Sequence, residues 1–194
     1  MEIDQIKNQA RQEHIPIMVE EGMQFLCDYL KNNIQLNDIL EVGSAVGYSA
    51  MNFARIRQQI KVDTIEIDEQ LYLQAVKNVA DSNLANQITC IHSDALVYTT
   101  DKQYDFIFID AAKGQYKNYL EHFYDNSHKG TIFAFDNVSF HGMIDHPQLT
   151  TNKRTLNLIK RIKKFRDWIL VEPRFSVDFH EDIGDGILIA KRIR

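Results

Sequence analysis

The segment Asp38-Ile-Leu-Glu-Val-Gly-Ser-Ala-Val-Gly-Tyr-Ser49 joins a short apolar strand to a helix through a loop that contains two glycines. Further strands and helices alternate after it, and this alternation predicts a mainly parallel sheet with helices on both faces. The last two strands have no helix between them, which predicts an antiparallel hairpin. We therefore expect an α/β, doubly wound, mostly parallel seven-stranded sheet, with strands at residues 38–42, 61–67, 87–92, 104–109, 131–135, 175–179 and 186–191.

Helical periodicity predicts the elements that cover this sheet, at residues 48–57, 69–83, 116–124 and 151–168. Two more helices, at residues 2–13 and 19–30, precede the first strand and are separated by Pro16. The chain has 194 residues with only 3 Pro and 8 Gly, which argues against long linkers. We expect a single domain over residues 1–194 with a helical amino-terminal segment of about 1–33.

The composition is that of an ordinary globular protein, with 44% hydrophobic and 25% charged residues. The first residues lack the basic and apolar regions of a signal peptide, and no apolar stretch is long enough to cross a bilayer. Cys27 and Cys90 have neither metal-site spacing nor the number typical of a disulfide scaffold. We therefore expect a cytoplasmic protein without a membrane partner.

Two apolar strands lead directly into side chains with oxygen ligands. Asp110 follows residues 106–109, and Asp136 and Asn137 follow residues 131–135. Open α/β sheets bind ligands at the carboxyl ends of their parallel strands, so neighbouring strands would bring these side chains together. Carboxylate and amide oxygens suit Mg²⁺ better than Zn²⁺. The alternative is that each Asp caps the helix after its strand.

The loop after the first strand lacks the G-x-G-x-x-G spacing of dinucleotide-binding proteins. Three residues separate Gly43 from Gly47, and Glu41 stands two positions before the first glycine. This arrangement resembles motif I of the class I S-adenosylmethionine methyltransferases. Glu41 would suit the α-amino group and sulfonium of that cofactor. Glu66, at the end of the second strand, would suit the ribose hydroxyls, and Asp94, after the third, the adenine.

The loop and the oxygen ligands together resemble the Mg²⁺-dependent O-methyltransferases of the catechol type, over nearly the whole chain. Further matches are the segments Phe108-Ile-Asp110-Ala-Ala-Lys113, His14-Ile-Pro-Ile-Met-Val19 and Gly184-Asp185-Gly186. The resemblance implies that Asp110, Asp136 and Asn137 hold Mg²⁺. It also implies that Lys113 assists deprotonation of the attacking hydroxyl, so Lys113 and Asp110 are the expected catalytic residues. The expected cofactor contacts are Val19, Glu41, Gly43, Ser49, Glu66, Asp94 and Asp110.

The chain is most similar to a bacterial branch of this family that methylates 5-hydroxyuridine at the wobble position of tRNA. The adjacent C5 hydroxyl and C4 carbonyl of that base could chelate Mg²⁺ as a catechol does. The resemblance thus implies S-adenosylmethionine and Mg²⁺ as cofactors, the anticodon loop of tRNA as substrate, and a homodimer. The alternatives are an O-methyltransferase of a small catechol-like phenol and a non-catalytic RNA-binding module that kept the fold.

Residues 146–166 contain no acidic side chain, although the net charge of the whole chain is −5. Basic side chains in this segment could contact RNA phosphates, or they could form the solvated face of a helix with an apolar inner face. The candidate RNA-binding residues are Lys153, Arg154, Lys160, Arg161 and Lys164. Four other residues could stack on a flipped base or pack inside the protein, namely Tyr116, Tyr119, Phe140 and His141.

Overall fold

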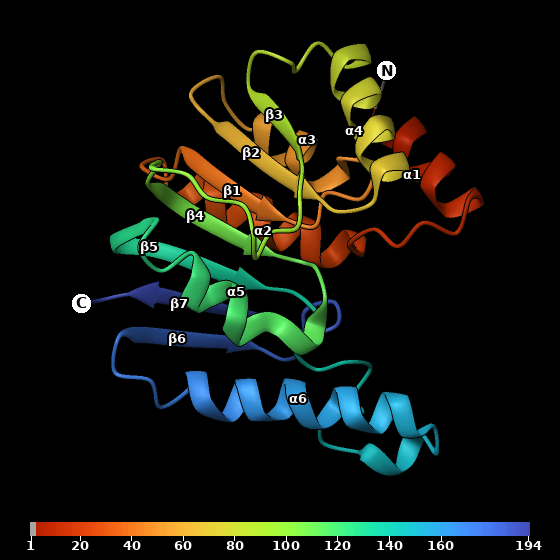
Figure 1. Ribbon diagram of the computed structural model, residues 1–194, viewed down its shortest axis with the longest axis vertical. Helices are drawn as coiled ribbons and strands as arrows, with labels where there is room; N and C mark the ends of the chain where they lie inside the picture. The colour runs from red at the N-terminus through yellow and green to blue at the C-terminus, as the bar shows by residue number, and fades with distance from the viewer. Residues whose placement is uncertain (1–2) are drawn as a thin grey trace.

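The computed structural model describes residues 3–194, whose strands form a seven-stranded sheet in the order β3-β2-β1-β4-β5-β7-β6 (Figure 1). Strands β1 to β5 are parallel, and β7 runs antiparallel between β5 and β6. The predicted sheet, with its antiparallel carboxyl-terminal hairpin, is confirmed. The strands are β1 (Asp38–Val42), β2 (Lys61–Glu66), β3 (Ile88–His92), β4 (Tyr104–Ile109), β5 (Ser127–Phe135), β6 (Phe175–His180) and β7 (Ile187–Arg192).

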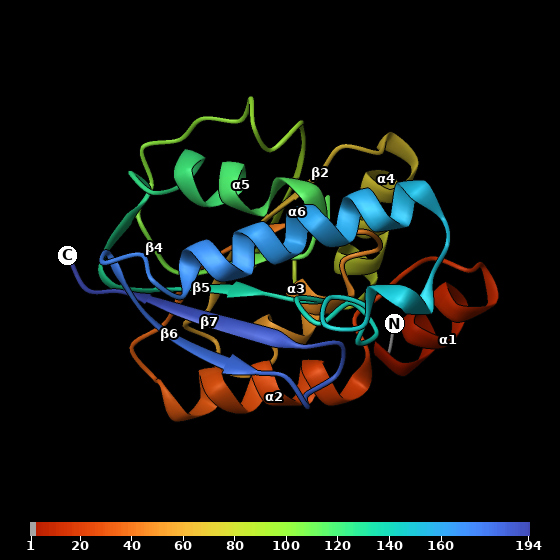
Figure 2. The same cartoon turned by 90° about the horizontal axis from the view of Figure 1, so that it is seen from below.

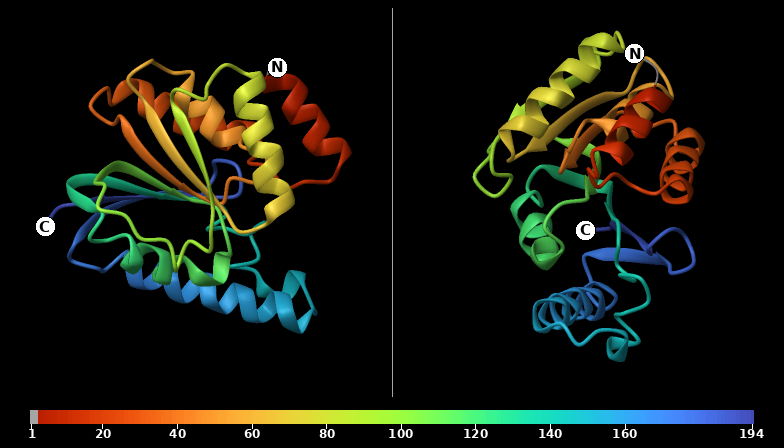
Figure 3. Two further views of the ribbon diagram at one scale, coloured as in Figure 1. Left: turned by 45° about the horizontal axis from the view of Figure 1, so that its top comes forward. Right: turned by 90° about the vertical axis from the view of Figure 1, so that its right-hand side faces the viewer.

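Helices cover both faces of this sheet, as the alternation of elements predicts. Helices α1 to α4 contribute to the apolar cluster on one face, and α5 and α6 to the cluster on the other. Figure 2 shows α2 on one side of the strands and α5 with α6 on the other, and Figure 3 shows the same layers from further directions. The helices are α1 (Ile3–Gln12), α2 (Glu20–Asn32), α3 (Tyr48–Ala54), α4 (Glu69–Asp81), α5 (Tyr116–His122) and α6 (Lys153–Ile169), with 3₁₀ turns η1 (Lys113–Gln115) and η2 (Pro147–Leu149).

The central strands are apolar on both sides because both of their faces are covered. Ile39 and Phe106 pack toward α1–α4, whereas Leu40 and Ile107 pack toward α5 and α6, and all four are fully buried. This packing fixes β1 and β4 in the middle of the sheet. Their carboxyl ends therefore lie side by side, flanked by those of β2 and β5.

Element boundaries differ from the predicted ones by a few residues. The predicted first residue of α1, residue 2, lies outside the described part of the chain. Helix α6 starts at Lys153 rather than at residue 151, because the Asn152 side chain accepts hydrogen bonds from Arg154 N and Thr155 N at 2.9 and 3.2 Å. Strand β5 starts at Ser127, four residues earlier than predicted, and pairs there with Tyr104 across a register shift.

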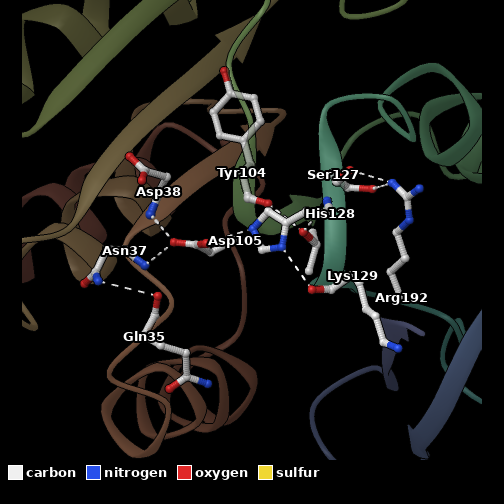
Figure 4. A network of polar contacts seen from close by, with 10 residues as sticks. Gln35, Asn37, Asp38, Tyr104, Asp105, Ser127, His128, Lys129 and Arg192 are labelled. Carbon is white, nitrogen blue, oxygen red and sulfur yellow. Dashed lines mark hydrogen bonds and ion pairs between the residues drawn. The ribbon is translucent and has the colours of Figure 1, made fainter. Parts of the chain in front are cut away.

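Polar contacts join neighbouring strands at the amino-terminal ends of the parallel strands. These contacts explain the early start of β5. Asp105 accepts hydrogen bonds from Asn37 N and Asp38 N at 2.8 and 3.0 Å, and its other oxygen lies 3.0 Å from His128 Nε2 (Figure 4). Arg192 Nη1 donates to the Ser127 carbonyl at 2.5 Å. These contacts tie together β1, β4, β5 and β7, so polar residues can begin a strand here. No helix within residues 3–194 is long and apolar enough to span a bilayer.

Candidate active site

A cavity of about 760 Å³ opens at the carboxyl ends of β1, β2, β4 and β5. With the exception of Glu41, every predicted cofactor, metal and catalytic residue lines it, so the structure brings together residues that are far apart in the sequence. The lining comprises residues 16–19, 42–45, 48–49, 65–67, 71, 93–96, 110–113, 115, 119, 136–137, 141 and 185.

The glycine loop after β1 lies directly against the end of β4. Gly43 has φ +98°, and a Cβ at this position would collide with the backbone carbonyl of Asp110. The loop is also held to β2, because Gly43 N and Ser44 N both donate to the Ile65 carbonyl, at 2.9 and 3.1 Å. Glycine is therefore required where the loop turns beneath the cavity. Val19, directly before α2, is half exposed and lines the cavity, and Ser49 is buried in the first turn of α3.

Backbone amides hold the Glu66 carboxylate at the end of β2. Its Oε1 accepts from Ile67 N and Asp68 N at 3.0 Å each, and its Oε2 accepts from Ala45 N at 2.8 Å. Asp94 is exposed after β3 and is oriented by Leu96 N, which donates to its Oδ1 at 2.9 Å. Both predicted cofactor acids therefore lie fixed on the cavity wall, while their contacts with ribose and adenine stay predictions.

Glu41 lies behind the cavity wall rather than on its surface. Its side chain is fully buried, Thr64 Oγ1 donates to its Oε2 at 2.5 Å, and its Oε1 has no hydrogen-bond partner within residues 3–194. Burial raises the pKa of Glu41 to about 8, although the hydroxyls of Thr64 and Ser49 act in the opposite direction. Direct contact between Glu41 and a cofactor stays a prediction.

The three predicted metal ligands leave β4 and β5 next to each other, because Ile109 pairs with Phe135 in the sheet register. Asp136 is buried and Asp110 is partly buried. Desolvation raises the pKa of both carboxyls, and the charge of Asp110 raises the pKa of Asp136 further. Asn137 N donates to Asp136 Oδ1 at 2.8 Å, which orients this carboxylate.

This set of donors fits a hard cation. Two adjacent carboxylates and an amide oxygen are ligands typical of Mg²⁺, and a divalent cation would offset the repulsion that raises the pKa of Asp136. Among residues 3–194, no group of three or more His, Cys, Asp or Glu side chains could hold a metal ion. The predicted site therefore consists of two carboxylates and the amide of Asn137, and metal binding stays a prediction.

Lys113 lies in the turn η1, three residues after Asp110. Its amine donates a hydrogen bond to Asn137 Oδ1, and it lowers the pKa of both Asp110 and Asp136. The side chain is half-buried on the cavity wall. A positive charge therefore lies beside the predicted metal ligands.

The cavity also contains residues that we did not predict to be functional. Asp185 is buried in the turn before β7, and its Oδ2 accepts a hydrogen bond from Asn137 Nδ2 at 3.3 Å. The Ser44 hydroxyl is buried and has no hydrogen-bond partner in the described part of the chain. The Gly184-Asp185-Gly186 motif was a signal for Asp185, whereas nothing in the sequence pointed to Ser44.

The four aromatic or imidazole candidates divide between packing and the cavity. Tyr116 is a packing residue, with ring centroids 5.6 and 5.5 Å from Phe135 and Phe165, and its hydroxyl donates to the Asp136 carbonyl at 2.7 Å. Phe140 packs on a small cluster with Ile144, Ile159 and Ile162 and does not line the cavity. The two that line the cavity are Tyr119, which is buried, and His141, which is exposed.

The basic segment forms helix α6, beside the turn that carries Lys113. A Cβ placed on Gly114 would meet Arg161 Cδ at 3.2 Å, so the Arg161 side chain lies against that turn. The five candidate RNA-binding residues are exposed, and no ion pair involves them among residues 3–194, whereas Lys163 and Arg166 pair with Asp167 and Asp145. We name these five residues the cationic stripe, because their spacing places them along one side of the helix: Lys153, Arg154, Lys160, Arg161 and Lys164.

Comparison with known proteins identifies the family. A family model described as O-methyltransferase matches residues 2–193. The caffeoyl-CoA O-methyltransferase of Medicago sativa is 28% identical to this chain, with coverage of 90% of this chain and 74% of the relative. The caffeoyl-CoA O-methyltransferase of Stellaria longipes is 26% identical, with coverage of 87% and 73%.

Solved structures agree with this result. A Staphylococcus aureus protein, provisionally described as a caffeoyl-CoA O-methyltransferase, is 30% identical, with a TM-score of 0.93 and coverage of 99% of this chain and 92% of that chain. An O-methyltransferase from Bacillus cereus in complex with SAH (S-adenosylhomocysteine) is 25% identical, with a TM-score of 0.83 and coverage of 98% and 90%. The chain therefore belongs to the O-methyltransferase family and is a class I, S-adenosylmethionine-dependent member homologous to the caffeoyl-CoA O-methyltransferases.

Proposed function

We propose that this protein transfers a methyl group from S-adenosylmethionine to the 5-hydroxyl of 5-hydroxyuridine at the wobble position of tRNA, giving 5-methoxyuridine. The observation that carries the proposal is the cationic stripe on α6, next to the turn with Lys113 at the wall of the cavity. A small phenol needs no such stripe, whereas the phosphates around a target base would lie against it.

Residues around the cavity supply the binding and orientation that methyl transfer needs. Asp94, Glu66 and the glycine loop form the wall where the cofactor is expected, and S-adenosylmethionine supplies a methyl group on a sulfonium when it is bound. In the transfer, the substrate oxygen forms a bond with the methyl carbon, and the electron pair of the broken carbon–sulfur bond stays on sulfur. The protein has to align the oxygen with that carbon.

Residues that follow β4 and β5 would hold the acceptor and assist its deprotonation. Asp110, Asp136 and Asn137 are the residues that would hold Mg²⁺, which, when bound, would lower the pKa of one of two adjacent substrate oxygens. Lys113 lines the cavity beside Asn137. Its amine could accept the hydroxyl proton or stabilise the oxyanion that remains.

The second candidate is methylation of a small catechol-like phenol. The names of the Medicago sativa and Stellaria longipes relatives favour it, because both are described as caffeoyl-CoA O-methyltransferases. Both candidates require two adjacent oxygens and the same three expected ligands. They differ in the rest of the substrate. A tRNA would bring a chain of phosphates to the cationic stripe and a free phenol would bring none, whereas the CoA part of a caffeoyl thioester carries phosphates of its own.

The test is a methyl-transfer assay with purified protein, Mg²⁺ and methyl-labelled S-adenosylmethionine. One reaction contains tRNA with 5-hydroxyuridine, a second contains the same tRNA without the hydroxyl, and a third contains caffeoyl-CoA. We expect label in the hydroxylated tRNA alone and loss of transfer after removal of Mg²⁺ by a chelator. Transfer to caffeoyl-CoA alone would contradict the tRNA proposal, and transfer that survives the chelator would contradict the role of Mg²⁺.

A further inference from the structure

Asp185 connects the predicted metal ligands with the loop that follows β5. It lies in the turn between β6 and β7, it is 8% exposed, and it lines the cavity. Its Oδ2 accepts a hydrogen bond from Asn137 Nδ2 at 3.3 Å, and its Oδ1 accepts one from His141 N. The two oxygens of one carboxylate thus hold two positions of the segment 137–141.

The bond to Asn137 selects one orientation of the side-chain amide. An amide group has a donor end and an acceptor end, whereas an ionised carboxylate only accepts. Asp185 can therefore bind only Nδ2, which directs Oδ1 of Asn137 away from it. The Lys113 amine donates to that same Oδ1, so Oδ1 faces the end of the cavity where the substrate oxygens would lie.

The backbone around both residues makes this arrangement rigid. Val138 N and Ser139 N donate to the carbonyls of Gly186 and Asp185, each at 3.0 Å. Gly186 has φ +83°, and a Cβ there would collide with the Ser139 side chain, so the turn and the loop are in close contact. Asn137 itself has φ +57°, in the left-handed region that Asn adopts more readily than most other residues.

We infer that Asp185 is a positioning residue that fixes the Asn137 amide with Oδ1 toward the metal and holds the loop with His141 at the cavity mouth. This inference rests on the proposed Mg²⁺-dependent transfer. Partners of metal ligands that lie outside the coordination sphere commonly contribute about 10- to 100-fold to metal affinity. The required feature is the carboxylate group and not the volume of the side chain, because a carboxylate has two oxygen atoms that can each accept a hydrogen bond.

The test compares the Mn²⁺ affinity of the wild type with that of Asp185→Asn, measured by electron paramagnetic resonance of free Mn²⁺. An Asn at this position has one acceptor oxygen and cannot satisfy both Asn137 Nδ2 and His141 N. We expect an affinity about 10- to 100-fold weaker than that of the wild type. The matched control is Asp182→Asn, which changes an exposed acid of the same turn that does not line the cavity and should leave the affinity unchanged.

Further measurements separate this inference from the proposed function and from misfolding. S-adenosylhomocysteine should bind all three proteins equally, because neither Asp185 nor Asp182 is among its expected contacts. Equal Mn²⁺ affinity of wild type and Asp185→Asn would overturn the inference and leave the proposed function standing. A wild type that binds no Mn²⁺ would overturn both.

Should Asp185→Asn fail to fold, hydrogen exchange of the Asn137 side-chain amide is measured in the wild type instead. Slow exchange supports the bond to Asp185, and exchange at the rate of a free amide excludes it.

Discussion

Two carboxylates and one amine determine the charge at the carboxyl ends of β4 and β5. Desolvation raises the pKa of Asp110 and Asp136, and Lys113 lowers both. Lys113 is hydrogen-bonded to Asn137 but is only half-buried, so it combines a fixed position with access to the cavity. This geometry supports a role for its amine in handling the proton of the acceptor hydroxyl.

Replacement of Lys113 by Met should therefore lower kcat by roughly 10²–10⁴-fold, the range typical of a lost general acid or base. The affinity for S-adenosylhomocysteine should stay unchanged, since the expected cofactor residues are untouched. Lys113→Arg keeps the charge but cannot accept a proton near neutral pH. Steady-state kinetics of both variants measure the effect, and a kcat of Lys113→Met within a few-fold of wild type would rule out this role.

Glu41 makes a prediction about stability as a function of pH. Burial raises its pKa from 4.5 to about 8 in the folded protein. Between these values the unfolded chain releases the proton while the folded chain keeps it, so rising pH favours unfolding. The resulting decrease in the free energy of unfolding is absent below pH 4.5 and complete above pH 8.

The variant Glu41→Gln lacks this titration. Its unfolding free energy relative to cofactor-free wild type should rise by roughly 2–4 kcal/mol between pH 5 and pH 9. Urea denaturation at pH 5, 7 and 9 measures the difference, in which the titrations of groups that do not interact with Glu41 cancel. A difference independent of pH would show that Glu41 titrates in the folded protein as it does in the unfolded chain.

Residue types at strand ends were predictable, but their environments were not. Asp110 and Asp136 follow apolar strands, and their placement follows from the general geometry of parallel sheets. The sequence could not show which way the Glu41 side chain points. Whether its carboxylate reaches the cavity surface depends on the contact with Thr64 and on the position of α3. Asp185 stands 48 positions after Asn137 in the sequence, and only the tertiary structure brings them into contact.

At the scale of elements, α6 has some features that the local sequence predicts and others that only the tertiary structure reveals. Its apolar spacing predicts an inner face formed by Leu156, Ile159, Ile162 and Phe165. The last three are buried as expected, whereas Leu156 is only partly buried. The sequence could not show that this helix lies beside η1, where the Arg161 side chain reaches Gly114. Likewise, the early start of β5 depends on contacts of Ser127 and His128 with other strands, which no local pattern reveals.

The cationic stripe predicts a specific effect on RNA binding. The triple variant Lys160→Gln, Arg161→Gln and Lys164→Gln should bind tRNA more weakly, and the slope of log affinity against log salt should fall by roughly 0.7 per lost phosphate contact. Fluorescence anisotropy between 50 and 200 mM salt, roughly the range over which such contacts matter most, measures both effects.

The matched control for the stripe is Lys163→Gln, which removes a cation of the same helix that is paired with Asp167 at 3.4 Å. This variant should retain nearly wild-type tRNA affinity. The melting temperature of all variants verifies the fold. Equal affinity and salt slope in the triple variant and the wild type would remove the structural basis for the tRNA proposal.

At the scale of the whole molecule, the amino-terminal and carboxyl-terminal ends of the parallel strands differ in how open they are. Contacts around Asp105 close the amino-terminal edge, whereas the cavity opens at the carboxyl-terminal edge. The net charge of −5 makes the protein as a whole repel nucleic acid, so the stripe on α6 would direct tRNA to one face. The alternation of elements predicted the parallel sheet and its final hairpin. It did not predict the order of the strands, in which β7 lies between β5 and β6.

The homodimer implied by the family resemblance is a further prediction at this scale. Sedimentation equilibrium should give a mass of about 45 kDa, twice the 22.6 kDa of one chain. A mass of 22.6 kDa at every concentration tested would contradict the prediction. A dimer would allow one tRNA to contact both subunits.

The proposed reaction is methylation of the 5-hydroxyl of wobble uridine in tRNA. Its most direct test is the modified-nucleoside profile of tRNA from cells that lack the protein, measured by mass spectrometry. We expect loss of 5-methoxyuridine with accumulation of 5-hydroxyuridine, restored by the wild-type protein and not by Asp110→Ala. An unchanged amount of 5-methoxyuridine in the cells without the protein would contradict it.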